Sequence, residues 1–291
     1  MNTHFKAFGA LLVGLSFMCF AAIFIKSAHA PGIVTAFYRM SIGTLVLTVP
    51  FIISLVQSTG KIPARGILFA SLAGLCFATD MAFWSTGVVM SNATIPTLTA
   101  NLAPLWVGFG SMIIFHQRHK PGFWIGLIIA ITGMVLLIHR DFMGNNHIGL
   151  GAFMGTVAGV FYGIFYLFSQ SGRKLLSTLH FLYISTLTSA LVLLMLMLIF
   201  RYDFIGYDRH TYMIFLGIGI GVQVCGWYLI NYSQGYLPAS TVAPTLLGQP
   251  VITAFLAVWL LDEHLTIWHI SGGLIVVSGI YLVHYSRSKS N

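Results

Sequence analysis

Charged side chains are scarce in this sequence. Asp, Glu, Lys and Arg together make up 7% of the 291 residues, and only six of them are acidic. A water-soluble domain contains about 25% charged residues, so a soluble fold does not explain this composition. The three cysteines, Cys19, Cys76 and Cys225, lie far apart in separate apolar runs, without the spacing of a disulfide framework or a metal site. The HExxH, GxSxG and P-loop motifs are also missing. We therefore predict no catalytic residue, no metal and no cofactor.

Long apolar runs are abundant instead, because hydrophobic residues make up 57% of the chain. A membrane-spanning helix needs about 20 mostly apolar residues. The net charge of +8 comes mainly from basic residues at the ends of these runs, which favours a lipid bilayer over nucleic acid as the partner. We predict an all-α integral membrane protein, multi-pass in the plasma (cell inner) membrane. Its ten transmembrane helices are expected at residues 6–25, 32–55, 66–90, 93–115, 121–139, 149–170, 178–200, 212–236, 239–261 and 268–285.

The N-terminal segment resembles a cleavable signal peptide, since Lys6 precedes an apolar run and the triplet Ala28-His29-Ala30. Lys26 separates that run from the triplet and Pro31 would follow the cut, so we expect the first helix to be retained.

Basic residues in the loops predict the orientation, because cytoplasmic loops are enriched in lysine and arginine. Nine of them fall on the side of the two chain ends and four on the other side. This predicts that the N- and C-termini are both cytoplasmic.

The chain repeats itself at a shift of 146 residues. Residues 93–140 align without a gap on residues 239–286, with Pro104 on Pro250, Gly126 on Gly272 and Gly133 on Gly279. Each copy contains five predicted spans, an odd number, so the second copy must be inverted in the membrane. This predicts two inverted five-helix repeats, at residues 1–140 and 141–291, a common architecture of secondary transporters.

Four segments resemble a known family: TAFYRMSIGTLVL at 35–47, DMAFW at 80–84, NATIPTLTANLAPLWV at 92–107 and QPVITAFLAVWLLDEHLTIWHISGGLIVVSGIYL at 249–282. They resemble the EamA-type branch of the drug/metabolite transporter superfamily over nearly the whole chain. The first repeat departs from the pattern, with His116 and Gln117 where the second has Asp262 and Glu263. The resemblance implies a carrier of small organic metabolites, often an exporter.

Two charged side chains, Arg39 and Asp80, lie well inside predicted spans, where each costs about 2.5–3.5 kcal/mol near a helix centre. At 1.5 Å per residue, Arg39 lies about 12 Å and Asp80 about 15 Å from the outer ends of neighbouring antiparallel spans. We therefore expect them to interact, as a structural ion pair or as a substrate or proton site. Snorkelling of Arg39 toward the membrane surface is a third interpretation.

Polar faces on other spans supply further candidates. One face of span 93–115 contains Thr94, Thr97, Asn101, Pro104, Gly108 and Ser111, where close helix packing competes with cavity lining as the explanation. One face of span 212–236 contains Gln223, Trp227, Asn231 and Gln234, which favours a cavity over lipid. The candidate substrate-binding set is Arg39, Asp80, Trp84, Asn101, Tyr162, Tyr166, Gln223, Trp227, Asn231 and Gln249, with Pro104, Pro250 and Gly108 as hinge or packing residues.

A secondary transporter with alternating access is the function that this architecture indicates. A membrane-embedded enzyme and a passive channel are the alternatives, although neither a catalytic motif nor a ring of charges supports them. The candidate residues include one arginine, one aspartate, amides and aromatic rings, but no basic cluster for a phosphorylated substrate. We expect zwitterionic or neutral metabolites, amino acids first, with a proton as candidate coupling ion and a monomer or homodimer as the assembly.

Overall fold

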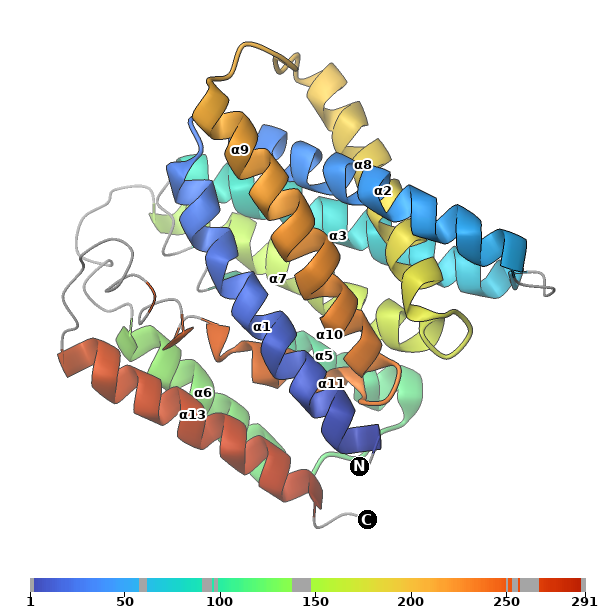
Figure 1. The fold of residues 1–291 in the computed structure, drawn as a ribbon. Helices are drawn as coiled ribbons and strands as arrows, with labels where there is room; N and C mark the ends of the chain where they lie inside the picture. Colours follow the sequence, from blue (N-terminus) through green and yellow to red (C-terminus); the bar gives the residue numbers. More distant parts are fainter. Residues whose placement is uncertain are drawn as a thin grey trace.

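The protein is described by a computed structural model, which covers residues 3–57, 62–90, 96, 99–137, 148–249, 251–252, 256 and 267–288. All regular elements in these ranges are helices (Figure 1). In chain order they are α1 (Thr3–Ser27), α2 (Gly32–Gln57), α3 (Ala64–Met90), α5 (Ala103–Phe115), α6 (Pro121–Leu137), α7 (Ile148–Gly172), α8 (Thr178–Ile199), α9 (Arg209–Gly217), the π-helix η2 (Ile218–Gly226), α10 (Trp227–Gln234), α11 (Ala239–Leu246) and α13 (Ile267–Ser288).

Six segments are long and apolar enough to cross a membrane, by length and composition. They are Thr3–Ala21, Gly32–Gln57, Ala64–Gly87, Leu150–Gly172, Thr178–Ile199 and Arg209–Gln234. Shorter apolar helices occupy Ala103–Phe115, Pro121–Leu136 and Ile270–Ser286. The all-helical prediction is confirmed for the described residues. The predicted total of ten spans is not confirmed, since parts of the fourth, fifth and ninth spans, the repeat boundary at 140/141 and Pro250 lie outside those residues.

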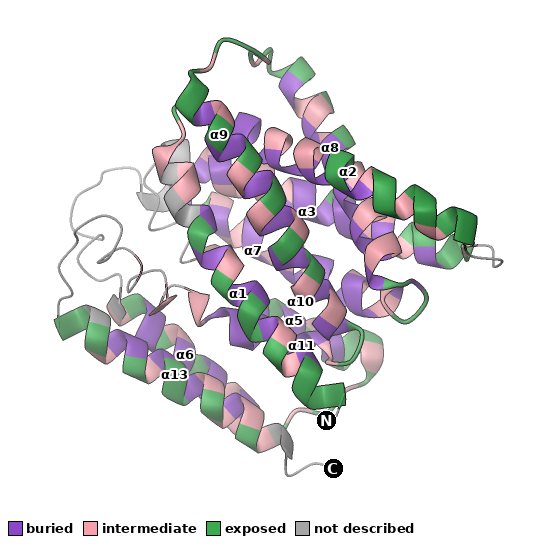
Figure 2. Ribbon diagram, viewed as in Figure 1, coloured by how far each residue is buried: buried purple, intermediate pink, exposed green. Residues whose placement is uncertain are grey.

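Many large apolar residues are exposed on the outside of the helices. Figure 2 marks the exposed positions in green. Val56 is 82% exposed, Ile113 75% and Leu45 71%, whereas Arg39 and Asp80 are 3% and 2% exposed. A soluble monomer rarely exposes large contiguous apolar patches, and hydrocarbon is the solvent that such a surface fits. The polar residues therefore lie between helices, where partners are available.

The 146-residue shift also appears in how the helices pack. It places α1 on α7, and α3 on the continuous helix formed by α9, η2 and α10. In the structure α3 packs along α7, and α1 packs along α9, η2 and α10. The same kind of helix pair therefore occurs twice. One pair joins α3 to α7, the equivalent of α1, and the other joins α1 to the equivalent of α3.

The other main contacts join equivalent helices, α2 with α8 and α6 with α13. Figure 1 shows α6 and α13 side by side at one edge of the bundle. Glycines allow this approach, since a Cβ on Gly126 would lie 2.8 Å from Gly279 O and one on Gly133 would lie 2.6 Å from Val276 N. The start of α1 and the end of α13 lie at the same end of the molecule (Figure 1).

Candidate functional site

Arg39 is held in the interior by the second half of the chain. Its Nε donates a hydrogen bond of 3.0 Å to Oε1 of Gln223, in the middle of η2. The Gln223 amide nitrogen in turn donates to Thr186 Oγ1 of α8 at 3.1 Å. The direct partner of the guanidinium is therefore Gln223.

Arg39 and Asp80 interact electrostatically, as expected, but without a direct contact between the two side chains. Asp80 lies on α3. Neither an ion pair within 4 Å nor a hydrogen bond joins its carboxylate to another described residue. Oδ2 of Asp80 and Nη2 of Arg39 are both buried without a hydrogen-bond partner among the described residues. The depth calculation gave the level of each charge along the membrane normal, but not its direction around the helix. Arg39 turns its Nε toward Gln223, a partner that the sequence did not reveal.

The two charges still lie in one cluster. The Arg39 guanidinium carbon is 5.7 Å from the ring centroid of Phe77, which precedes Asp80 by one helical turn. Tyr162 of α7 lies close enough to interact electrostatically with both Arg39 and Asp80. Tyr166 donates its hydroxyl to the Tyr162 hydroxyl at 2.7 Å, so α7 contributes a pair of linked hydroxyl groups to this cluster.

Trp227 packs against the aromatic rings of the cluster and lines neither of the two cavities described below. Its ring packs edge-on against Phe77 at 5.0 Å and against Phe165 at 5.1 Å between centroids. It is 1% exposed, and its Nε1 has no hydrogen-bond partner among the described residues.

Two of the cavities within the described part of the bundle contain predicted site residues. The first, of about 130 Å³, is lined by Ile25, Ala30, Gly32, Thr35, Ala36, Arg39, Met81, Trp84, Ser85 and Ile218. The second, of about 20 Å³, is lined by Asn101, Ala103, Pro104, Tyr162, Tyr166, Ala243, Leu246, Leu247 and Gln249. Six of the ten predicted residues line these two cavities, Arg39 and Trp84 in one and Asn101, Tyr162, Tyr166 and Gln249 in the other. The remaining four, Asp80, Gln223, Trp227 and Asn231, line neither of them.

The amide face of span 212–236 does not line either of these two cavities. Asn231 donates its side-chain amide to Trp227 O at 2.8 Å. Its backbone oxygen accepts a 2.7 Å hydrogen bond from Nε of Arg173, whose guanidinium also binds Thr178 Oγ1 at 2.8 Å and Leu176 O. Arg173 is one of the nine basic loop residues on the side of the chain ends, and its partners, which are distant in sequence, leave no local pattern. Gly108 behaves as a packing residue, since a Cβ there would lie 3.0 Å from Trp124.

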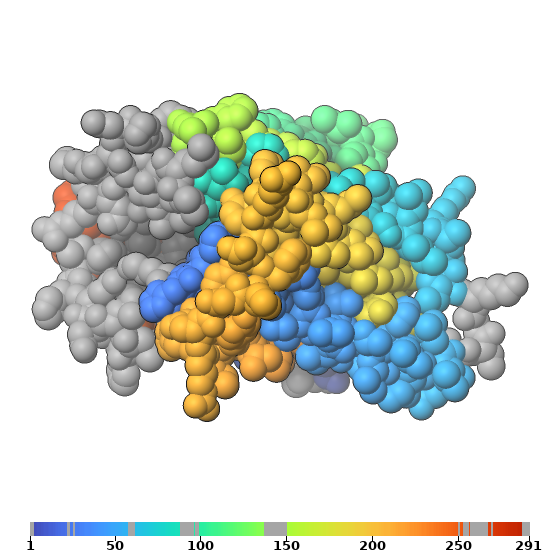
Figure 3. Space-filling model, turned by 90° about the horizontal axis from the view of Figure 1, so that it is seen from above, coloured from blue at the N-terminus to red at the C-terminus, as the bar shows by residue number. Residues whose placement is uncertain are grey.

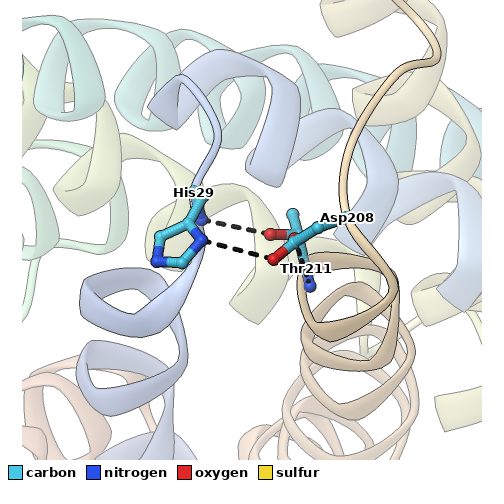
Figure 4. Close-up of polar contacts among 3 residues, drawn as sticks. All are labelled: His29, Asp208 and Thr211. Carbon is cyan, nitrogen blue, oxygen red and sulfur yellow. Dashed lines mark hydrogen bonds and ion pairs between the residues drawn. The ribbon is translucent and has the colours of Figure 1, made fainter.

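A polar contact joins the two halves of the chain beside the larger cavity (Figure 4). The backbone nitrogen of His29, next to the cavity residue Ala30, donates to Thr211 Oγ1 at 3.2 Å, and His29 Nδ1 lies 3.4 Å from Asp208 Oδ2. Asp208 caps α9 by accepting a 2.9 Å hydrogen bond from Thr211 N. Hydrogen bonds from Thr211 lower the pKa of Asp208, with a smaller contribution from His29. Figure 3 looks down on this end of the molecule, where the residues before and in α9 lie beside α1 and α2.

Comparison with known proteins agrees with this architecture. The EamA-like transporter family matches residues 6–139 and again residues 149–285. An uncharacterized transporter of Archaeoglobus fulgidus is 30% identical over 216 residues, which cover 70% of this chain and 72% of that protein. A second uncharacterized transporter of the same organism is 20% identical over 273 residues, covering 94% of both chains.

A solved crystal structure shows the same fold. It aligns over 97% of each chain with a TM-score of 0.79, at 16% sequence identity. Since the family matches twice over most of the sequence and a relative reaches 30% identity, the chain belongs to the EamA-like transporter family of the drug/metabolite transporter superfamily.

Proposed function

We propose that this protein is a secondary transporter that moves small zwitterionic or neutral metabolites, with L-amino acids as the first candidates, by alternating access. The supporting observation is a cavity of about 130 Å³ that reaches the buried Arg39, with Asp80 nearby. The proposed direction is export, after the resemblance to exporters, with both termini in the cytoplasm.

The chemistry of the cluster favours a ligand with both charges. Nη2 of Arg39 and Oδ2 of Asp80 are buried without partners among the described residues, and a buried polar atom without a hydrogen bond costs about 1–3 kcal/mol. A zwitterion can satisfy both, with its carboxylate on Arg39 and its ammonium on Asp80. Ile25, Met81 and Trp84 provide apolar contacts for the remainder of such a molecule.

The packing of the helices supports alternating access between two inverted repeats. Arg39 and Asp80 come from the first repeat, whereas Gln223 and the Tyr162–Tyr166 pair come from the second. The cluster therefore lies where the repeats meet, and a rocking motion of one repeat against the other would expose it to each side in turn. Pro104 beside the smaller cavity is the proposed hinge residue among the described positions.

Counterflow in proteoliposomes tests the proposal. Vesicles preloaded with unlabelled L-amino acids should accumulate radiolabelled L-amino acids transiently and saturably, and Arg39→Met should abolish this signal. Ser189→Ala is the matched control, since it removes a buried 2.7 Å hydrogen bond to Gly74 O that involves none of the side chains of the cluster, and it should leave counterflow intact. Non-saturable flux without counterflow would indicate a channel, chemical conversion of the label would indicate an enzyme, and no flux of any L-amino acid would refute the substrate class.

A further inference from the structure

The span that contains Gln223 has an unusual backbone. Residues Ile218–Gly226 form a π-helix between two α-helical segments, α9 and α10. π-helical segments within α-helices are rare and occur often at functional sites. Three glycines at alternate positions, Gly217, Gly219 and Gly221, lie in or directly before this segment. These glycines have a packing role as well, because a Cβ on Gly219 would lie 2.7 Å from Ile42 Cβ of α2.

The side chain of Gln223 occupies a site that closely fits it. It is 2% exposed, and both ends of its amide are hydrogen-bonded, to Arg39 Nε and to Thr186 Oγ1. Gly43 of α2 makes room for it, since a Cβ at that position would lie 2.7 Å from Gln223 Cγ.

Gln223 accepts a hydrogen bond from only one of the two donors on one edge of the Arg39 guanidinium. Nε and Nη2 of arginine are neighbouring donors in the planar fork that binds a carboxylate with two parallel hydrogen bonds. In Arg39 the Nε donor is bound to the Gln223 amide oxygen, while Nη2 is buried without a partner in the described residues. An amide oxygen can replace one oxygen of a carboxylate, but it leaves the second donor unsatisfied.

We propose that Gln223 is a positioning residue that holds Arg39 in the empty carrier and is displaced by the carboxylate of the substrate. The proposal rests on the proposed function, because it requires a ligand with a carboxylate. Displacement exchanges one neutral acceptor for a charged one that satisfies both Nε and Nη2. The π-helix suits this exchange, since returning its extra residue to an α-helical turn would rotate the following residues by about 100°.

Three variants test the proposal with butyrate, a simple apolar carboxylate, as the probe. Butyrate binding is measured as the rise in melting temperature of the detergent-purified full chain over a concentration series. In Gln223→Leu the half-saturating concentration should fall about tenfold, because no hydrogen bond to a charged group must be broken first. In Gln223→Glu it should rise about tenfold or more, because a fixed carboxylate occupies Arg39. Gln223→Met replaces the leucine variant if that variant does not fold.

A purely structural role for Gln223 predicts a different pattern. It would lower the melting temperature and the maximal flux without moving the half-saturating concentration. The control Ser189→Ala should likewise leave the half-saturating concentration unchanged, and its flux should stay intact. In counterflow of radiolabelled L-amino acids, the proposal instead predicts a lower KM in Gln223→Leu without a higher maximal flux.

Two results would overturn the proposal. One is weaker butyrate binding in Gln223→Leu than in the wild type, and the other is unchanged butyrate binding in Gln223→Glu. Absence of any butyrate effect in all variants would also overturn it, since Arg39 would then not receive a carboxylate. If the butyrate series behaves as expected while no L-amino acid is transported, Gln223 is still a positioning residue that a carboxylate displaces, and only the substrate class in the proposed function is wrong.

Discussion

Removing the two buried charges, one at a time and together, separates folding from transport. In Arg39→Met the Gln223 oxygen loses its donor, and the Asp80 carboxylate loses the nearest opposite charge. Stranding one member of a buried charged set typically costs about 3–5 kcal/mol. The single variant should therefore show a clearly lower melting temperature and little correctly folded protein.

The double variant Arg39→Met with Asp80→Leu should recover part of that loss. It removes both charges from the low-dielectric interior. The unpaired side-chain oxygen of Gln223, which costs about 1–3 kcal/mol, remains in both variants. The difference between the two variants is therefore the cost of the stranded charge, about 3–5 kcal/mol in favour of the double variant. Adding Gln223→Leu should restore a further part, because the unpaired amide is then removed too.

Transport should not follow stability in this series. Counterflow in proteoliposomes, normalised to monodisperse protein after size-exclusion chromatography, should be absent in every variant that lacks Arg39, because nothing remains to bind the substrate carboxylate. Recovery of flux in the double variant would refute a functional role for the charges. A double variant no more stable than Arg39→Met would refute the interaction between them.

Three further predictions concern the scaffold and its orientation. In a cysteine-free background, Ser177→Cys should react with a membrane-impermeant thiol reagent only from the cytoplasmic side and Ile205→Cys only from outside; the reverse pattern would invert the proposed topology. Gly279→Leu should destabilise the α6–α13 contact by about 1–3 kcal/mol or more, because its side chain would meet backbone atoms of α6. The control Val277→Leu, at a 55% exposed position, should leave the melting temperature unchanged. Asp208→Ala should lower the melting temperature at neutral pH. The lowered pKa of Asp208 means that its stabilising contribution needs the ionised form, so the difference from wild type should shrink once the pH falls below the ordinary pKa of 3.8 and vanish only below the lowered pKa of the folded state. A difference that persists at still lower pH would contradict the cap.

Hydropathy predicted most of the helical architecture, because a helix in hydrocarbon must be apolar over its whole length. The expected span 178–200 corresponds to Thr178–Ile199, and 32–55 corresponds to Gly32–Gln57. The internal shift likewise predicted which helices are equivalent, and their pairwise packing follows it. These features depend on averages over many residues, so single substitutions do not obscure them.

The details of the candidate site depended on contacts that a single sequence does not reveal. Steps of four, four and three residues placed Gln223, Trp227, Asn231 and Gln234 on one face, and that spacing does not distinguish a regular α-helix from one with a π-helical segment. In the structure Gln223 binds Arg39, Trp227 packs among aromatic rings and Asn231 bonds to its own helix. Partner choice was decided by direction around each helix, which hydropathy does not report.

The scaffold is repeated, but the charges of the candidate site are not. The 146-residue shift pairs Arg39 with Ser185 and Asp80 with Gly226, so the first repeat supplies both charges and the second supplies neutral groups. A symmetric pair of sites would offer two orientations of a bound zwitterion, whereas a one-sided pair of charges defines a single orientation. The second repeat then contributes the groups that can exchange, above all Gln223 on its π-helix. In the proposed transport cycle, a two-fold scaffold with a one-sided site would allow the two repeats to move against each other while the ligand keeps one set of charged partners throughout.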